Sequence, residues 1–340
     1  MDRHPVLSAW MGCEEMAAIL GWEAELAAML RVWTALAAAQ AEAGVLAPEA
    51  ARAVERACAG FAPDTDALRD GVRRDGVVVP ALLAQLRPRV QAPYADALHR
   101  GATSQDLVDS ALALRLGEAL TLLGRRLDAV TGALDAAEAR WGDRPLTART
   151  RMRAALPTTV GERVARWRRP LVRARAAMPA EALAVQLGGP IGRDGGSVRA
   201  GLAARLGLSD PGASWHTERE RLGAVVAWAA GLSNALGKMG LDLGLMAQDE
   251  VGEARIAGGG SSAMPHKSNP VDAELLVALA RHAATLSGGW HQAIHEGERS
   301  GAAWTLEWLT LPPLLEATAA GLAAAMRLLA AVDALGVAPD

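Results

Sequence analysis

A proline-free segment between Gln105 and Trp141 is the feature that most constrains the fold of this chain. Within it, apolar residues recur at spacings of four, three, four, three and four: Leu116, Leu120, Leu123, Leu127, Val130 and Leu134. This is the heptad pattern of a helix that packs along its length against other helices. At about 1.5 Å per residue such a helix spans roughly 55 Å. We therefore expect an elongated helical bundle.

The remaining segments show the same helical periodicity, and no convincing alternating strand stands out. Further long helices are predicted at about 158–187 (bent at Pro170), 217–252, 270–296 and 306–335, and shorter ones at 14–43, 48–58 and 79–88. The predicted fold class is all-α. Five long helices in residues 101–340 follow a small helical N-terminal domain in residues 1–100. Glycines inside the third long helix indicate close approach to neighbouring helices: Gly231, Gly237, Gly240 and Gly244.

Composition excludes several classes of function. The 340 residues are 51% hydrophobic with a net charge of −3, which argues against a disordered chain and against a general nucleic-acid binder. No apolar run approaches the roughly 20 residues of a membrane helix, and the N-terminus has no signal-peptide pattern. A cytoplasmic protein without a membrane partner is expected. Cys13 and Cys58 are interpreted as core residues, and no metal or organic cofactor is predicted because no ligand spacing is present.

The segment 257–270 is the least helix-like stretch between long helices. It combines three glycines with Ser261, Lys267 and Asn269, which offer a nucleophile or base, a cation and hydrogen-bond donors. Asn269 precedes Pro270 and is predicted to cap the next helix, where backbone N–H groups would point at an anion. The competing interpretation is a flexible linker between helices. It is not a P-loop, because His266 stands where that motif needs glycine.

The string Gly-Ser-Ser-x-Met-Pro-x-Lys-x-Asn-Pro in this segment resembles the signature of the fumarase/aspartase superfamily, and a second element of that superfamily is similar to residues 99–106. The resemblance implies that Ser261 is the catalytic serine, with Lys267 as the rival proton donor. It also implies that His99, Thr103 and Ser104 face the substrate. Their alternative roles are a cap or core histidine for His99 and helix caps for Thr103 and Ser104.

Four further stretches resemble one group in that superfamily, the 3-carboxy-cis,cis-muconate cycloisomerases of protocatechuate breakdown: residues 186–189, 215–221, 295–300 and 304–308. Arg151 stands where fumarases and adenylosuccinate lyases carry a histidine, and this favours the cycloisomerase. The resemblance implies lactonization of a small tricarboxylate. The alternatives are an adenylosuccinate-type lyase and a catalytically silent structural homologue. His216 and His295 fall in these stretches without an assignable role.

Arginines could bind the carboxylates of such a substrate. Arg149, Arg151 and Arg153 recur at every second position and offer planar cationic forks, although in an arginine-rich chain they could equally form a solvated basic stretch. We expect Arg149, Arg151 and Asn269 to bind substrate. Because successive bundle helices start at opposite ends, the motifs cannot all meet in one chain. Active sites shared between several subunits are therefore expected. The resemblance implies that the assembly is a homotetramer, and that the chain is a short form without the superfamily's C-terminal domain.

Overall fold

The computed structural model describes residues 4, 6–193, 195–260, 264 and 267–336. Its helices are α1 (Ser8–Met11), α2 (Glu14–Leu20), α3 (Trp22–Glu42), α4 (Pro48–Cys58), α5 (Thr65–Asp75), α6 (Val79–Leu86), α7 (Ser104–Trp141), α8 (Val160–Ala176), α9 (Gly196–Leu206), α10 (Glu220–Met246), α11 (Val271–Trp290) and α12 (Gly301–Ala330). The strands are β1 (Pro145–Thr150), β2 (Arg153–Thr159), β3 (Ala254–Ile256) and β4 (Val332–Leu335).

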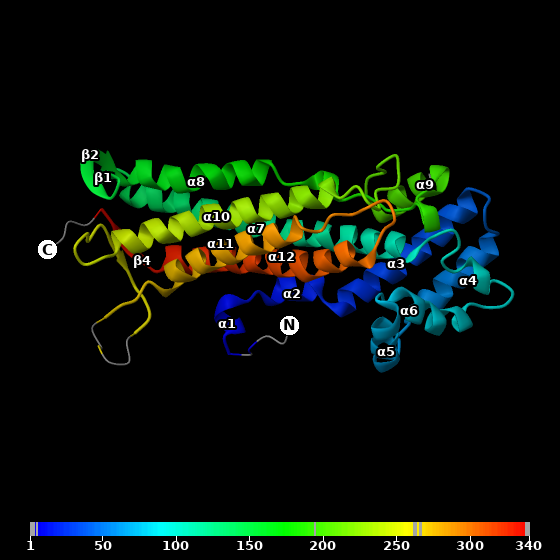
Figure 1. Cartoon of the computed structure of the whole chain (residues 1–340). Helices are drawn as coiled ribbons and strands as arrows, with labels where there is room; N and C mark the ends of the chain where they lie inside the picture. The colour runs from blue at the N-terminus through cyan, green and yellow to red at the C-terminus, as the bar shows by residue number, and fades with distance from the viewer. Residues whose placement is uncertain (1–3, 5, 194, 261–263, 265–266, 337–340) are drawn as a thin grey trace.

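The five long helices α7, α8, α10, α11 and α12 lie side by side and form the elongated bundle that the sequence predicts (Figure 1). All six heptad residues of α7 are at most 4% exposed, which confirms the predicted seam. Residues from α7, α8, α10, α11 and α12 contribute to one continuous apolar core. A second core lies at one end of the bundle, where α3, α4 and α6 pack with α9 and the first turns of α7.

Several predicted helix boundaries were wrong, each for a local reason. The expected helix at 14–43 is two helices, because Gly21 takes an extended conformation with φ −76° and ψ 171° between α2 and α3. The helix expected to reach residue 187 ends at Ala176, where Pro179 follows and disfavours helical backbone in the residue before it. The helix α5 was not predicted. Its hydrophobic face is short, since only Leu68 and Gly71 are buried.

The predicted all-α fold class is confirmed, but the structure adds four short strands among the described residues that the sequence did not indicate. β1 and β2 form an antiparallel hairpin in which Thr150 pairs with Arg153, and β3 pairs with β4. Most residues of the β1–β2 hairpin are exposed, so the hairpin needs no alternation of apolar and polar residues and gave no such signal. The strands are short, and the fold remains predominantly helical.

The glycines of α10 fall into two groups. A Cβ at Gly237 would lie 2.4 Å from the Cβ of Ala280, and one at Gly240 would lie 2.6 Å from the carbonyl oxygen of Ala273. These two glycines let α11 pack closely against α10. A Cβ at Gly231 or Gly244 would meet nothing within 4 Å in this chain.

One helix, α12, is long and apolar enough by composition to span a membrane. In the structure, 67% of its apolar window is buried. It packs against α7, α10 and α11, so its apolar character is accounted for by its position in the bundle core.

Candidate functional site

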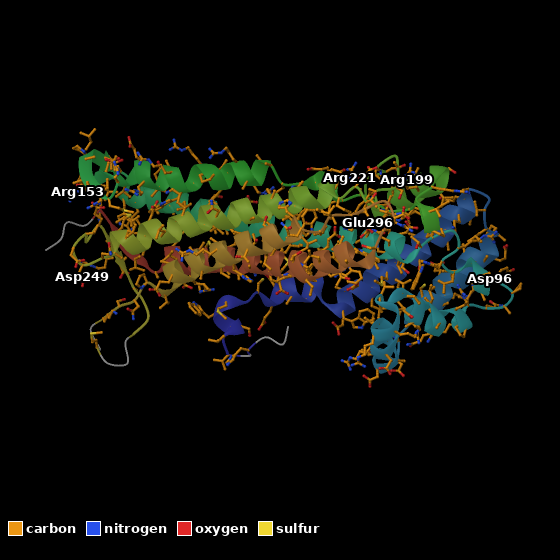
Figure 2. The ribbon with its side chains drawn as sticks, in the orientation of Figure 1. Asp96, Arg153, Arg199, Arg221, Asp249 and Glu296 are labelled. Atoms are coloured by element: carbon orange, nitrogen blue, oxygen red, sulfur yellow. The ribbon has the colours of Figure 1, made fainter. Side chains whose placement is uncertain are left out.

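The predicted site residues separate into two groups at opposite ends of the bundle. His99, Thr103 and Ser104 lie where α7 begins, which we call the motif end. Arg149 and Arg151 belong to the β1–β2 hairpin at the other end, together with the loop that holds Lys267 and Asn269; we call this the hairpin end. Figure 2 shows Arg153 at the hairpin end and Glu296 toward the motif end. Ser261 lies outside the described residues.

Asp106 organises the motif end. Its side chain is 3% exposed and accepts hydrogen bonds of 2.8 Å from the backbone N–H groups of Thr103, Gly188 and Gly189. Its Oδ1 atom also lies 2.8 Å from Nε2 of His216. Thr103 occupies the N-cap of α7, as its alternative interpretation predicted. Asp106 therefore joins the start of α7 to the loop after α8 and to the segment before α10.

The tautomer of His216 follows from its partners. Nη1 of Arg299 lies 2.8 Å from Nδ1 of His216, and a guanidinium can only donate. Nδ1 is therefore the acceptor, and the proton on Nε2 is donated to Asp106. Arg299 also donates to the carbonyl oxygen of Pro190 and has a left-handed backbone with φ 55°. The segment between α11 and α12 is thus tied to the Gly188–Gly192 loop through one arginine.

A second buried network lies one helical turn further along α7. Arg219 donates from Nη1 to Asp109 at 2.6 Å and from Nε to Glu307 at 2.9 Å, and Nε2 of His295 lies 2.9 Å from Glu307. These four side chains are at most 5% exposed. The network therefore joins α7, α10 and α12 through charged groups in the protein interior.

The electrostatics of this network favour the charged forms of Arg219 and Glu307. Burial alone would lower the pKa of Arg219, but the carboxylates of Asp109 and Glu307 outweigh it and raise that pKa. Burial would raise the pKa of Glu307, but hydrogen bonds from His295 and Arg219 lower it overall. Because each charge has an opposite partner, the ions can remain buried.

His99 has a strained backbone and a neutral ring. Its φ is 63°, and Nε1 of Trp33 donates to its Nδ1 at 2.9 Å. Burial lowers its pKa to about 4, with Arg87 acting in the same direction and Asp106 opposing. At neutral pH the ring is therefore uncharged and carries its proton on Nε2. His99 can offer a substrate a hydrogen bond from that nitrogen, but not a positive charge.

The arginines of the hairpin end have different environments. Nη1 of Arg149 forms an ion pair of 2.7 Å with Glu253, whose side chain is 9% exposed. Arg151 and Met152 form the two-residue turn of the hairpin, with φ of 49° and 64°. The three arginines of the sequence repeat therefore lie in different parts of the hairpin: Arg149 in β1, Arg151 in the turn and Arg153 in β2. Left-handed backbone at two non-glycine residues is costly and often marks a functional site.

The loop before α11 is closed by a short backbone bridge. Asn269 N–H donates to the carbonyl of Gly259 at 2.9 Å, and Gly259 N–H donates back at 3.0 Å. The prediction that Asn269 caps the next helix was wrong. The helix begins at Val271 with Pro270 in the N-cap position, since the backbone of Asn269 is used in this bridge. The side chain of Lys267 is exposed at the surface of the loop.

Sequence reasoning missed the roles of Asp106, Asp109, Arg219 and Glu307. Asp106 and Asp109 lie three residues apart on a buried face of α7, and two carboxylates on such a face are a signal that they have buried partners. Arg219 and Glu307 fall inside the stretches that resemble cycloisomerases. In the part of the chain that the structure describes, no group of three metal-ligating side chains gathers to hold an ion.

Comparison with known proteins places the chain among lyases. A family model described as "Lyase" matches residues 14–284. The 3-carboxy-cis,cis-muconate cycloisomerase of Pseudomonas aeruginosa is 36% identical over 97% of this chain and 76% of its own length. The nitrosuccinate lyase of Streptomyces davaonensis is 35% identical over 89% of this chain and 69% of its own length.

Comparison with solved structures supports the same family. The 3-carboxy-cis,cis-muconate lactonizing enzyme of Pseudomonas putida has a TM-score of 0.89 at 31% identity, covering 97% of this chain and 77% of that chain. This chain thus spans about three quarters of the length of these cycloisomerase relatives. The family match, the relatives and the loop signature coincide, and the chain belongs to the lyase family of the fumarase/aspartase superfamily.

Proposed function

We propose that this protein catalyses the lactonization of 3-carboxy-cis,cis-muconate to 4-carboxymuconolactone, a step of protocatechuate degradation. The observation that carries the proposal is the similarity to four curated cycloisomerases, which are 32–36% identical over 86–97% of this chain. In this reaction one carboxylate oxygen adds to a double bond that a second carboxylate activates. A proton is then delivered to the neighbouring carbon, so no atom leaves the substrate.

The proposed roles follow from the charge that the reaction develops. The substrate carries three carboxylates, and additional negative charge builds up on the activating carboxylate during addition. Lys267 and Asn269 would stabilise this charge, and Ser261 or Lys267 would deliver the proton. Arg151 is exposed at the tip of the hairpin and suits a carboxylate. Arg149 would act beside it, oriented by its ion pair with Glu253.

Residues of the motif end would complete the site from another subunit. His99 would donate a hydrogen bond through Nε2, and Thr103 and Ser104 would bind carboxylate oxygens at the positive end of α7. The 38 residues of α7 separate the two ends by roughly 55 Å, too far for one chain to bring these groups together. We therefore propose a homotetramer whose active sites are shared between subunits.

Two exposed features support such an assembly. The β1–β2 hairpin presents Met152 and Leu156, which are 78% and 72% exposed, next to the arginines. Large apolar side chains on a projecting hairpin are typical of a surface that another chain covers. On α10, Gly231 and Gly244 face open space in the single chain and leave room for close contact with a second helix.

A second candidate function is elimination from a substituted succinate. The nitrosuccinate lyase of Streptomyces davaonensis is nearly as similar to this chain as the first cycloisomerase, at 35% against 36% identity. An adenylosuccinate-type lyase is the related alternative. Both reactions break a bond between carbon and nitrogen, whereas the cycloisomerase reaction forms a bond between carbon and oxygen.

An ultraviolet assay separates these functions. The conjugated diene of 3-carboxymuconate loses its absorbance on lactonization, so the purified protein should bleach this substrate. The same sample should leave nitrosuccinate and adenylosuccinate unchanged, with fumarate release as the readout. Fumarate release without diene loss would assign the elimination instead. We also propose a cytoplasmic location, because the composition is that of a soluble metabolic enzyme.

A further inference from the structure

A cavity of about 950 Å³ lies away from the predicted catalytic residues, between the bundle and the N-terminal helices. Its walls come from α3, α5, α7 and α12, and Figure 1 shows α5 next to α6 at the motif end of the bundle. Most of its lining is apolar, and this includes Leu68, Val72, Leu112, Leu311 and the indole of Trp308. A volume of this size suits a small organic molecule.

One charged side chain in the wall is incompletely paired. Arg115 is 7% exposed and its Nη1 donates to the carbonyl oxygen of Leu20 at 3.3 Å. Its Nη2 lies 3.7 Å from Glu25, beyond hydrogen-bond distance, and its Nε has no partner among the described residues. A guanidinium has five N–H donors, and leaving them unsatisfied in a protein interior is costly.

The surroundings of Arg115 leave its charge undercompensated. Burial lowers the pKa of Arg115, and the opposing effects of Glu25 and Glu118 do not restore it. Two other arginines line the cavity, but each already has a carboxylate partner on α5: Arg69 pairs with Asp66 at 2.7 Å and Arg73 with Asp70 at 2.8 Å. Three carboxylates also line the cavity, Glu23, Glu25 and Glu307, and Glu307 is paired with Arg219. Among the arginines of the lining, Arg115 is the buried one with an unsatisfied donor, and it is therefore the cation available to a ligand.

We propose that this cavity binds a compact apolar monocarboxylate, whose carboxylate pairs with Arg115 and whose hydrocarbon body fills the space between α5 and α12. A planar carboxylate matches the fork of a guanidinium. The hydrocarbon body of the ligand would bury Leu68, Val72, Leu112 and Leu311. An aromatic ring in that body would contact Trp308. Glu25 competes with the ligand for Arg115, so the charge of Glu25 lowers the affinity of the cavity for the ligand. This site is separate from the proposed lactonization and does not depend on it.

Calorimetric titration with benzoate tests the proposal, with benzamide as the uncharged probe of the same shape. Benzoate should bind saturably, and benzamide at least about tenfold more weakly, because it cannot form the ion pair. Glu25→Gln should tighten benzoate binding by removing the competing carboxylate. Arg115→Met should abolish it.

Because Arg115→Met removes a buried charge and could impair folding, a second variant closes the cavity from its rim. Val72 is 40% exposed on α5, and Val72→Trp should abolish benzoate binding while the melting temperature is kept. Val172→Trp, at a 41% exposed position of α8, is the matched control and should bind like the wild type. No binding to the wild type, equal binding of benzamide, or unchanged binding to Val72→Trp would overturn the proposal.

Discussion

Arg219 holds two buried carboxylates together, and its removal should be among the most damaging single changes in this chain. Arg219→Met would leave Asp109 and Glu307 without their shared cation, which we expect to lower the free energy of unfolding by about 3–5 kcal/mol. Urea denaturation measures this loss. Arg52→Met is the control, since its pair with Glu49 is 54% and 55% exposed and should change stability by no more than about 0.5 kcal/mol. Equal effects of the two variants would contradict this account of the network.

His99 should make stability depend on pH. Its pKa is about 4 in the folded protein against 6.5 for the ordinary side chain, so the unfolded chain binds more protons between these values. Stability should therefore fall as the pH is lowered from about 6.5 to 4. His99→Asn should reduce this fall, because asparagine tolerates the left-handed backbone but does not titrate. Melting temperatures of the wild type and the variant, recorded between about pH 6.5 and 4, measure this fall in stability.

The matched control is His282→Asn at an exposed position of α11, measured over the same pH range. The His99 variant should show a shallower decline in melting temperature than both the wild type and this control. A decline as steep as that of the wild type would mean that His99 does not contribute to it.

Ser261 and Lys267 are expected to act in the chemistry itself. Ser261→Ala and Lys267→Met should each reduce turnover of 3-carboxymuconate by at least about 100-fold, as for a lost proton donor or charge stabiliser. Circular dichroism should show unchanged helix content, since Lys267 is exposed. Near-normal turnover in both variants would remove the 257–270 loop from the reaction.

Among the elements, α10 and α11 depend on glycine for their close approach. Gly240→Ala would place a methyl group 2.6 Å from the carbonyl oxygen of Ala273, and we expect it to lower stability by about 1–3 kcal/mol. Gly132→Ala, on the exposed side of α7, meets nothing within 4 Å and should stabilise the helix by about 0.5–1 kcal/mol. Thermal unfolding of the two variants compares them directly. A gain in stability for both variants would show that helix propensity, and not the contact with Ala273, governs Gly240.

At the scale of the whole molecule, the separation of the two ends makes shared active sites testable. Lys267→Met alters the hairpin end, and Ser104→Glu places a negative charge at the motif end, where it would repel a tricarboxylate. Glutamate is favourable in the first turn of a helix, so Ser104→Glu should fold. Each variant alone should be inactive. Mixed after subunit exchange, they should regain activity, because some sites then combine two intact ends.

Sedimentation supplies the control for this experiment by showing that both variants and the mixture are tetramers. A monomer at the concentration used in the activity assay would contradict the proposal of shared active sites. So would verified subunit exchange without recovery of activity.

The sequence by itself determined the helical framework and the family of this protein. The heptad seam of α7 is a local pattern, and each helical hydrogen bond joins residues four apart, so the pattern is readable without the fold. The loop signature around Lys267 and Asn269 predicted the family, because it too is a local pattern of neighbouring residues. The alternation of helix directions also predicted that the motif end and the hairpin end are far apart.

Only the tertiary structure decided the networks and the hairpin. Asp109 and Arg219 are 110 residues apart, and Arg219 and Glu307 are 88 apart, so their pairing depends on how α7, α10 and α12 pack. The β1–β2 hairpin is mostly exposed, with Leu146 the one buried residue of its two strands, and it therefore carries no periodic signal. The physical reason is the same in both cases: local hydrogen bonding and burial leave a pattern in the chain, whereas contacts between distant segments are set by packing geometry.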